Sequence, residues 1–189
     1  MNDTPDTKRD DERPIRERLR ADTAESHNRI DRRLGALDLG TVDGLSRLLG
    51  AHHLVQARLD PLCDPDPRPG FVEALGRDLQ ALGRPVPVWR DPPDTTGLHP
   101  LGYRYVVTGS QMGARLLHRD WSRATDPHVR AAGAWMEANR QSRAWPELLG
   151  RLRGLVLSPG EADHVVTSAD RVFRIYDRAA TELGVDAAS

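Results

Sequence analysis

The 189-residue sequence is poor in several residue types, and each shortage excludes a class of protein. Its single cysteine, Cys63, excludes a disulfide framework and a cysteine-rich zinc site. Aromatic residues make up 5% of the chain, and no apolar run approaches the roughly 20 residues that a membrane span requires. Lysine occurs once, at Lys8, so cationic roles fall to arginine, whose planar guanidinium suits carboxylates and phosphates.

The charges are nearly balanced, with 27 basic and 28 acidic residues and a formal net charge of −1. Such a chain has no broad basic field with which to neutralise phosphates, so we expect no nucleic-acid partner. The N-terminal residues are charged throughout and lack the apolar centre of a secretory signal. We therefore expect a cytoplasmic protein that does not associate with a membrane.

Helical periodicity dominates the chain, and glycine and proline stand mostly between helical blocks. We expect a disordered tail over residues 1–13, one helical domain over 14–184 and a short C-terminal tail over 185–189. Residues 103–108 have strand propensity, but helical blocks on both sides favour a helix there. The sequence thus predicts an all-α, single-domain bundle with helices over residues 14–37, 41–60, 71–82, 96–122, 126–139, 145–157 and 159–183.

His27 is the first residue that points to chemistry. It falls in the middle of the predicted apolar face of the first helix, between Thr23 on one side and Ile30 and Leu34 on the other. A buried imidazole needs a partner, because an unpaired buried polar group costs about 1–3 kcal/mol. A metal ion or a haem iron would be such a partner. A backbone carbonyl or a neighbouring side chain would serve equally well.

The second feature is the segment TGSQMGA, residues 108–114, in which Gly109 and Gly113 share one face of a predicted helix. Each glycine costs about 1 kcal/mol relative to alanine in a helix interior. Two such glycines favour close approach of the backbone to a flat ligand. Close packing of two helices through small residues explains them equally well.

Several segments together resemble the bacterial haem oxygenases, especially the group associated with bacteriophytochromes. The likeness runs from about Arg16 to Leu183 and includes Trp145. It rests on LRADTAESHNRIDRRL (19–34), GRDLQALGRPVP (76–87), YRYVVTGSQMGARLL (103–117) and SADRVFRIYDRA (168–179). The resemblance implies a haem oxygenase-like bundle that opens haem with dioxygen and external electrons, giving biliverdin, iron and carbon monoxide. It also implies an electron donor of the ferredoxin or flavodoxin type, and a bacteriophytochrome as an acceptor of the pigment.

The resemblance also implies roles for individual residues. His27 would be the proximal ligand of the haem iron, and Gly109, Ser110 and Gly113 would line the distal face. In the animal-type enzymes an aspartate stands where this sequence has Ser110, so proton delivery would pass to waters held by the serine and the backbone. Arg20, two helical turns before the histidine, would bind a haem propionate.

Tyr105 and Phe173 complete the residues that the resemblance places at the haem. Tyr105 is a weaker candidate for a propionate, and Phe173 would pack on or near the macrocycle, although an ordinary core role suits it as well. The sequence offers little support for other chemistries: Glu161 and His164 form a lone E-x-x-H, where a di-iron bundle needs two. Two rivals stay open, namely a haem-binding module that does not turn over, and an interaction protein on the same fold.

Overall fold

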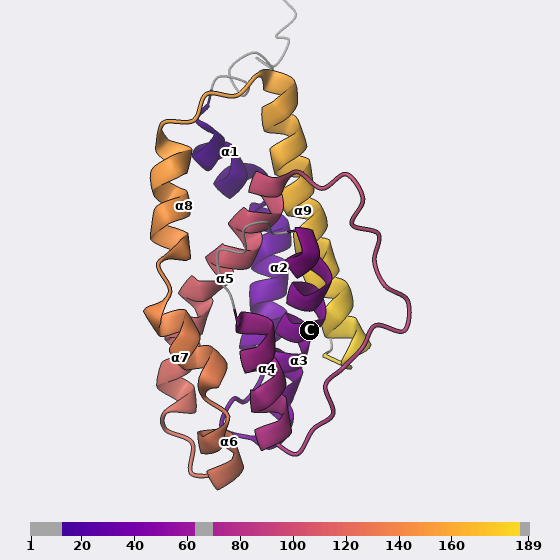
Figure 1. Cartoon of the computed structure of the whole chain (residues 1–189), viewed down its shortest axis with the longest axis vertical. Helices are drawn as coiled ribbons and strands as arrows, with labels where there is room; N and C mark the ends of the chain where they lie inside the picture. The colour runs from indigo at the N-terminus through magenta and orange to yellow at the C-terminus, as the bar shows by residue number, and fades with distance from the viewer. Residues whose placement is uncertain (1–12, 63–69, 186–189) are drawn as a thin grey trace, which may run out of the picture.

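The computed structural model describes residues 13–62 and 70–185, apart from the side chains of residues 111–116. Every regular element in these ranges is a helix, which confirms the all-α prediction. Figure 1 shows an elongated bundle with α1, α8 and the start of α9 at one end and α6 at the other. The helices are α1 (Ile15–Asp22), α2 (Ala24–Gly35), α3 (Val42–Leu59), the 3-10 turn η1 (Asp60–Leu62), α4 (Phe71–Ala81), α5 (Pro100–Trp121), α6 (Pro127–Ala131), α7 (Ala134–Gln141), α8 (Ala144–Arg153) and α9 (Pro159–Glu182).

Two hydrophobic cores fill the bundle. The first lies among α1, α2, α3, α5, α8 and α9, and α9 contributes Val165, Val172 and Tyr176 to it. The second joins α3 to α4, α6 and α7, with Trp135 fully buried at its centre. Among the described helices, none is long and apolar enough to cross a membrane. Val185, which the sequence analysis assigns to the C-terminal tail, is buried in the first core.

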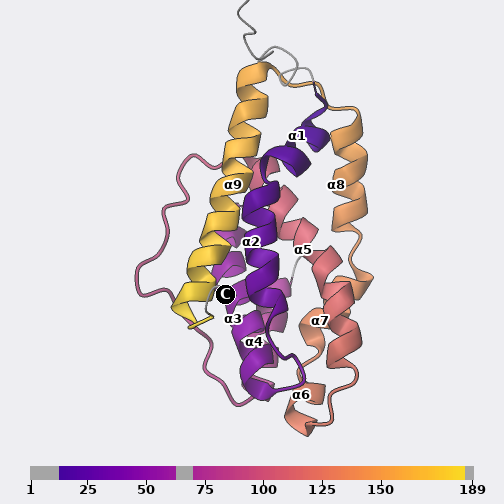
Figure 2. The same ribbon diagram turned by 180° about the vertical axis from the view of Figure 1, so that it is seen from behind.

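The prediction of one continuous helix over residues 14–37 is wrong, because Thr23 separates α1 from α2. The threonine has φ −105° and ψ 4°, outside the helical region. Its hydroxyl donates to the carbonyl oxygen of Leu19 at 2.6 Å, a bond to the preceding turn that bends helices. α1 and α2 are therefore separate helices inclined to each other, as Figure 2 shows from behind.

The predicted helix over residues 126–139 is also two helices, because a distant carboxylate starts a new one. Asp78 of α4 accepts hydrogen bonds from the backbone N–H groups of Ala134 and Trp135, both at 2.8 Å. It thus satisfies two of the donors that a helix start leaves unpaired. Burial raises the pKa of Asp78, and the two backbone N–H groups act in the opposite direction.

α5 begins at Pro100, later than the predicted Thr96, because His99 caps it. The Nδ1 atom of His99 accepts from the N–H of Leu101 at 3.1 Å, and Pro100 occupies the first helical position, where its missing N–H costs nothing. The backbone N–H of His99 donates to the hydroxyl oxygen of Ser168 at 2.9 Å, which ties the start of α5 to α9.

α5 and α9 approach most tightly at Gly102. An ideal Cβ built at this glycine would lie 2.5 Å from the carbonyl oxygen of Val165 and 2.9 Å from the backbone nitrogen of Ala169. Both obstacles are backbone atoms, so a rotamer change cannot relieve the clash. Any side chain at position 102 therefore pushes the two helices apart.

We expect Gly102→Ala to lower the free energy of unfolding by about 1–3 kcal/mol, the usual cost of overpacking. Gly150 provides the matched control, because it lies in α8 with nothing within 4 Å of an ideal Cβ. Gly150→Ala should raise the free energy of unfolding by about 0.5–1 kcal/mol through helix propensity. Denaturant unfolding followed by circular dichroism measures both, and equal effects would contradict the close crossing.

We also expect acid to weaken the start of α5. Burial and the neighbouring His164 lower the pKa of His99, whereas Glu161 raises it. The unfolded chain then takes up a proton at about pH 6.5, before the folded protein does, so the free energy of unfolding falls as the pH drops below that value. His99→Asn keeps a capping oxygen that does not titrate. The free energy of unfolding of this variant, measured with denaturant, should therefore fall less between pH 7.5 and pH 5. An unchanged pH dependence in this variant would exclude the histidine as the source.

Candidate functional site

His27 lies on α2 with its side chain 52% exposed, which differs from the buried position expected from the sequence. The break at Thr23 explains the difference. It rotates α2 relative to α1, so the buried stripe of α2 passes through Ser26, Ile30 and Arg33 instead of through the histidine. The imidazole is therefore accessible to a ligand in the present arrangement of the helices.

Two neighbours orient the imidazole of His27. Its Nδ1 lies 3.4 Å from Oδ2 of Asp31, one helical turn later, and its ring packs edge-to-face on Phe173 of α9, with centroids 5.3 Å apart and planes at 84°. In metal-ligating histidines a carboxylate often lies beside one ring nitrogen and orients the ring, so that the other nitrogen can bind the metal. Sequence reasoning missed Asp31, although its spacing of four residues from His27 was a usable signal.

The bare face of α5 at Gly109 meets α8. An ideal Cβ at this glycine would lie 3.3 Å from Cζ3 of Trp145, and the Trp145 ring is also tilted against Tyr105 with centroids 5.5 Å apart. The packing of two helices therefore accounts for one side of Gly109. The Ser110 hydroxyl donates to the carbonyl oxygen of Val107 at 2.8 Å.

Gly113, the second predicted distal residue, belongs to the stretch of α5 whose side-chain surroundings lie outside the described residues. Its proposed place on the distal face therefore stays a prediction. Cys63 also lies outside the described residues.

Arginines of α1 lie close to Tyr105. Burial raises the pKa of the phenol, and the charges of Arg16 and Arg20 lower it. Arg20 is exposed, as a residue that binds a ligand carboxylate must be before the ligand arrives. The charge of Arg20 thus reaches Tyr105, and the resemblance implies a place near a haem propionate for both residues.

The predicted site residues form two groups. His27 and Phe173 lie where α2 meets α9, and Arg20, Tyr105 and Gly109 lie where α1, α5 and α8 converge. α9 packs against both α2 and α5 and so links the two groups.

His164 and Glu161, which form the E-x-x-H segment, have structural tasks. His164 donates from Nε2 to the carbonyl oxygen of Gly97 at 2.8 Å, and Glu161 forms a capping box with Ser158 at the start of α9. Within the described part of the chain, no group of three or more His, Cys, Asp or Glu side chains is placed to hold a metal ion. The hydrogen bonds given above account for both side chains of the E-x-x-H segment.

Comparison with known proteins identifies the fold. No family model and no curated protein sequence matches this chain. Among solved structures, the NO- and CO-bound haem oxygenase from Neisseria meningitidis superposes on it with a TM-score of 0.70. The match covers 93% of this chain and 95% of the other at 19% sequence identity. The chain therefore has the all-helical haem oxygenase fold.

Proposed function

We propose that this protein is a haem oxygenase that converts haem to biliverdin, iron and carbon monoxide. The observation that carries the proposal is the accessible imidazole of His27, whose Nδ1 lies 3.4 Å from Oδ2 of Asp31, on a chain with the haem oxygenase fold. An accessible imidazole with an oriented ring has the chemistry that a proximal haem ligand requires. Bound haem would supply the activation of dioxygen and the oxidative opening of its own ring.

The chain's own residues would bind and orient the haem. His27 would hold the iron through Nε2, with Phe173 against the edge of its ring. Arg20 would pair with a propionate, because a guanidinium matches a carboxylate with two parallel hydrogen bonds. Tyr105 would lie near the same carboxylate, because the positive charges of Arg16 and Arg20 act on its phenol and lower its pKa.

On the distal side, Gly109, Ser110 and Gly113 would leave space above the haem and hold a proton donor. The Ser110 hydroxyl gives its own proton to the carbonyl oxygen of Val107. Its oxygen lone pairs therefore remain available to accept from a water. We assign proton delivery to waters bonded to this hydroxyl and to the backbone, because serine replaces a carboxylate at this position.

The proposal includes the partners of the reaction. The electrons would come from an external ferredoxin- or flavodoxin-type donor. The product is of the kind that a bacteriophytochrome takes up as its pigment. An electron donor and a pigment acceptor of these kinds would make the protein a haem oxygenase of the bacteriophytochrome-associated type, acting in the cytoplasm.

A haem-binding protein without turnover is the second candidate, and one observation favours it. Trp145 occupies the side of Gly109 on which a missing side chain would otherwise leave room. If the tryptophan keeps that place when haem binds, the distal face is narrower than catalysis requires.

We expect added hemin to give a Soret band that His27→Ala removes, because the variant lacks the iron ligand. His128→Ala is the matched control, since His128 is exposed on α6 at the opposite end of the bundle from α1. With ascorbate or a ferredoxin-type reductase under air, the wild-type complex should lose the Soret band and form biliverdin. A stable complex without ring opening would favour the binding protein, and a spectrum that is independent of His27 would contradict both candidates.

We expect Gly109→Leu to reduce biliverdin formation by about 100-fold, the scale of loss that a misplacement of about 1 Å causes at a reacting centre. The contact with Trp145 supplies a way to separate packing from catalysis. Adding Trp145→Phe removes the atoms that the new side chain meets, so the double variant should regain thermal stability without regaining turnover. Recovery of both would show that Gly109 serves only the packing of α5 on α8.

A further inference from the structure

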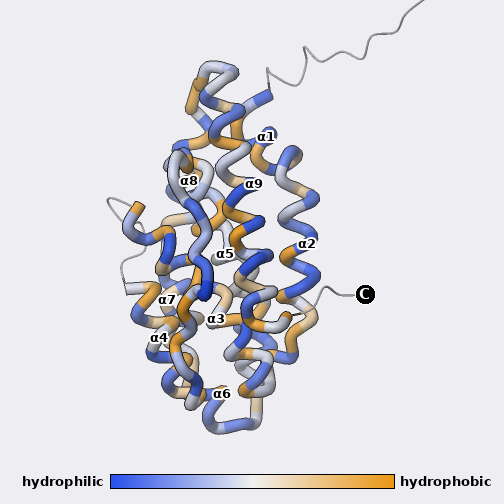
Figure 3. The backbone as a smooth tube through the Cα atoms, turned by 90° about the vertical axis from the view of Figure 1, so that its right-hand side faces the viewer, coloured by the Kyte–Doolittle hydropathy of each residue, from blue (hydrophilic) through white to orange (hydrophobic). Residues whose placement is uncertain are grey.

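α2 has little apolar surface with which to hold its place in the bundle. Of its three buried residues, Ser26, Ile30 and Arg33, two are polar. Figure 3 shows α2 as a largely hydrophilic stretch of the backbone. Burial of apolar area is non-directional, so Ile30 and the partly buried Leu34 do not by themselves define how α2 is rotated or how far it slides along its neighbour. Polar contacts have to do so.

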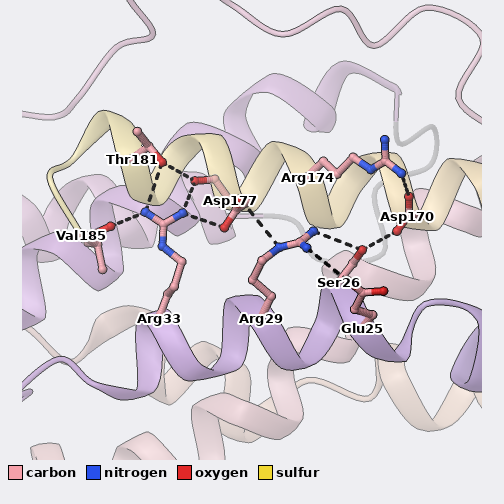
Figure 4. Close-up of polar contacts among 9 residues, drawn as sticks. All are labelled: Glu25, Ser26, Arg29, Arg33, Asp170, Arg174, Asp177, Thr181 and Val185. Atoms are coloured by element: carbon pink, nitrogen blue, oxygen red, sulfur yellow. Dashed lines mark hydrogen bonds and ion pairs between the residues drawn. The ribbon is translucent and has the colours of Figure 1, made fainter. Parts of the chain in front are cut away.

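Two polar pairs join α2 to α9 in a single register. The Ser26 hydroxyl donates to Oδ1 of Asp170 at 2.5 Å, and Nη1 of Arg33 donates to Oδ1 of Asp177 at 2.6 Å (Figure 4). The partners of each pair are 144 residues apart in the chain, so the two helices run in the same direction without a change of register. On each helix the two contact points are seven residues apart, or about 10.5 Å along the axis. We call these two pairs the α2–α9 clamp.

The clamp is reinforced by neighbouring groups. Nη2 of Arg33 donates to the Thr181 hydroxyl at 3.1 Å and to the carbonyl oxygen of Val185. Arg29 lies 3.9 Å from Oδ2 of Asp177, and Arg174 holds Asp170 at 2.6 Å. The Arg33 side chain is only 9% exposed, so a shift of α2 would leave a buried guanidinium without its partners. The register is therefore costly to change.

His27 and Phe173 lie between the two pairs. His27 follows Ser26 directly, and Phe173 stands three residues after Asp170 and four before Asp177, on the same face of α9. A slip of α2 by one residue would turn the imidazole by about 100° and remove it from the Phe173 ring. The break at Thr23 means that α1 cannot hold α2 through a continuous helix.

We propose that Ser26, Asp170, Arg33 and Asp177 are positioning residues that set the rotation and the axial position of α2 on α9. They thereby fix the direction in which His27 presents its imidazole. This geometric part of the proposal applies to the protein without a ligand. The haem part, that the clamp also determines how tightly haem binds to His27, rests on the proposed function.

The geometric part is tested by NMR on the protein without haem, in Ser26→Ala, Asp170→Asn and Asp177→Asn. Each change weakens one pair and keeps the side-chain volume similar or smaller. The ring protons of His27 should lose their nuclear Overhauser contacts to Phe173 and shift toward their positions in Phe173→Leu, which defines the signal without the aromatic neighbour. Unchanged His27 signals in folded variants would overturn the proposal.

Asp163→Asn is the matched control. Asp163 is also on α9 and binds a buried arginine, Arg18, at 2.6 Å, but this pair holds α1 and not α2. It should leave the His27 signals as in the wild type while lowering thermal stability as the clamp variants do. If Asp163→Asn moves the His27 signals as much, the positioning is not specific to the clamp and the proposal fails. Should Asp177→Asn not fold, Ser26→Ala, which removes a single hydroxyl, decides the same question.

The haem part is tested by hemin titration of the same variants. We expect the clamp variants to raise the hemin Kd by about tenfold, the lower end of what the loss of a ligand-orienting group costs in metal affinity. Asp163→Asn should leave it unchanged. An equal Kd in all variants would overturn the haem part. A hemin affinity that does not depend on His27 would instead refute the proposed function, while the NMR result would stand independently.

Discussion

The arrangement of this bundle depends on directional polar contacts that fasten three helices to α9. Asp163 binds Arg18 of α1, Ser168 receives the backbone N–H of His99 at the start of α5, and Asp170 receives the hydroxyl of Ser26 on α2. Hydrophobic burial supplies most of the free energy of such a fold but does not specify register. Hydrogen bonds with defined geometry do, because each donor has few acceptors within reach.

Fastening helices through buried arginines has an energetic consequence. Removing a guanidinium from water is expensive, and its ion pair recovers that cost only when the remaining donors are satisfied. Arg33 meets only part of this condition: Nη1 and Nη2 donate to the carboxylate of Asp177, the hydroxyl of Thr181 and two backbone carbonyl groups, whereas the buried Nε has no hydrogen-bond partner among the described residues. We infer that the contact contributes specificity of placement more than net stability. Placement is what the imidazole on the same helix needs if it is to meet a ligand in one orientation.

The two sides of the candidate site differ in how they are built. On the side of α2 an accessible imidazole lies beside Asp31 and Phe173, and polar pairs hold the helix that carries it. On the side of α5, the neighbourhood of Gly109 is aromatic, with Trp145 and Tyr105 in contact. The first arrangement fixes the direction in which the imidazole points, whereas the second limits the space beside α5.

Much of the fold could be predicted from interactions between residues close together in the sequence. The period of about 3.6 residues, the prolines at helix starts and the glycines after helix ends predicted an all-α chain and the positions of α3, α4 and α9 to within a few residues. His27 was singled out from helical periodicity, and Arg20 and Tyr105 through resemblance; the structure adds that the charge of Arg20 lowers the pKa of the Tyr105 phenol, which burial raises.

Non-local contacts produced what the residues alone did not reveal. The carboxylate of Asp78 starts α7 from another helix, Arg33 is buried against α9 although arginine usually reads as surface, and Trp145 fills the space at Gly109. Periodicity and capping report on neighbours within a few residues. These contacts join residues far apart in the chain, so their existence depends on how the helices pack.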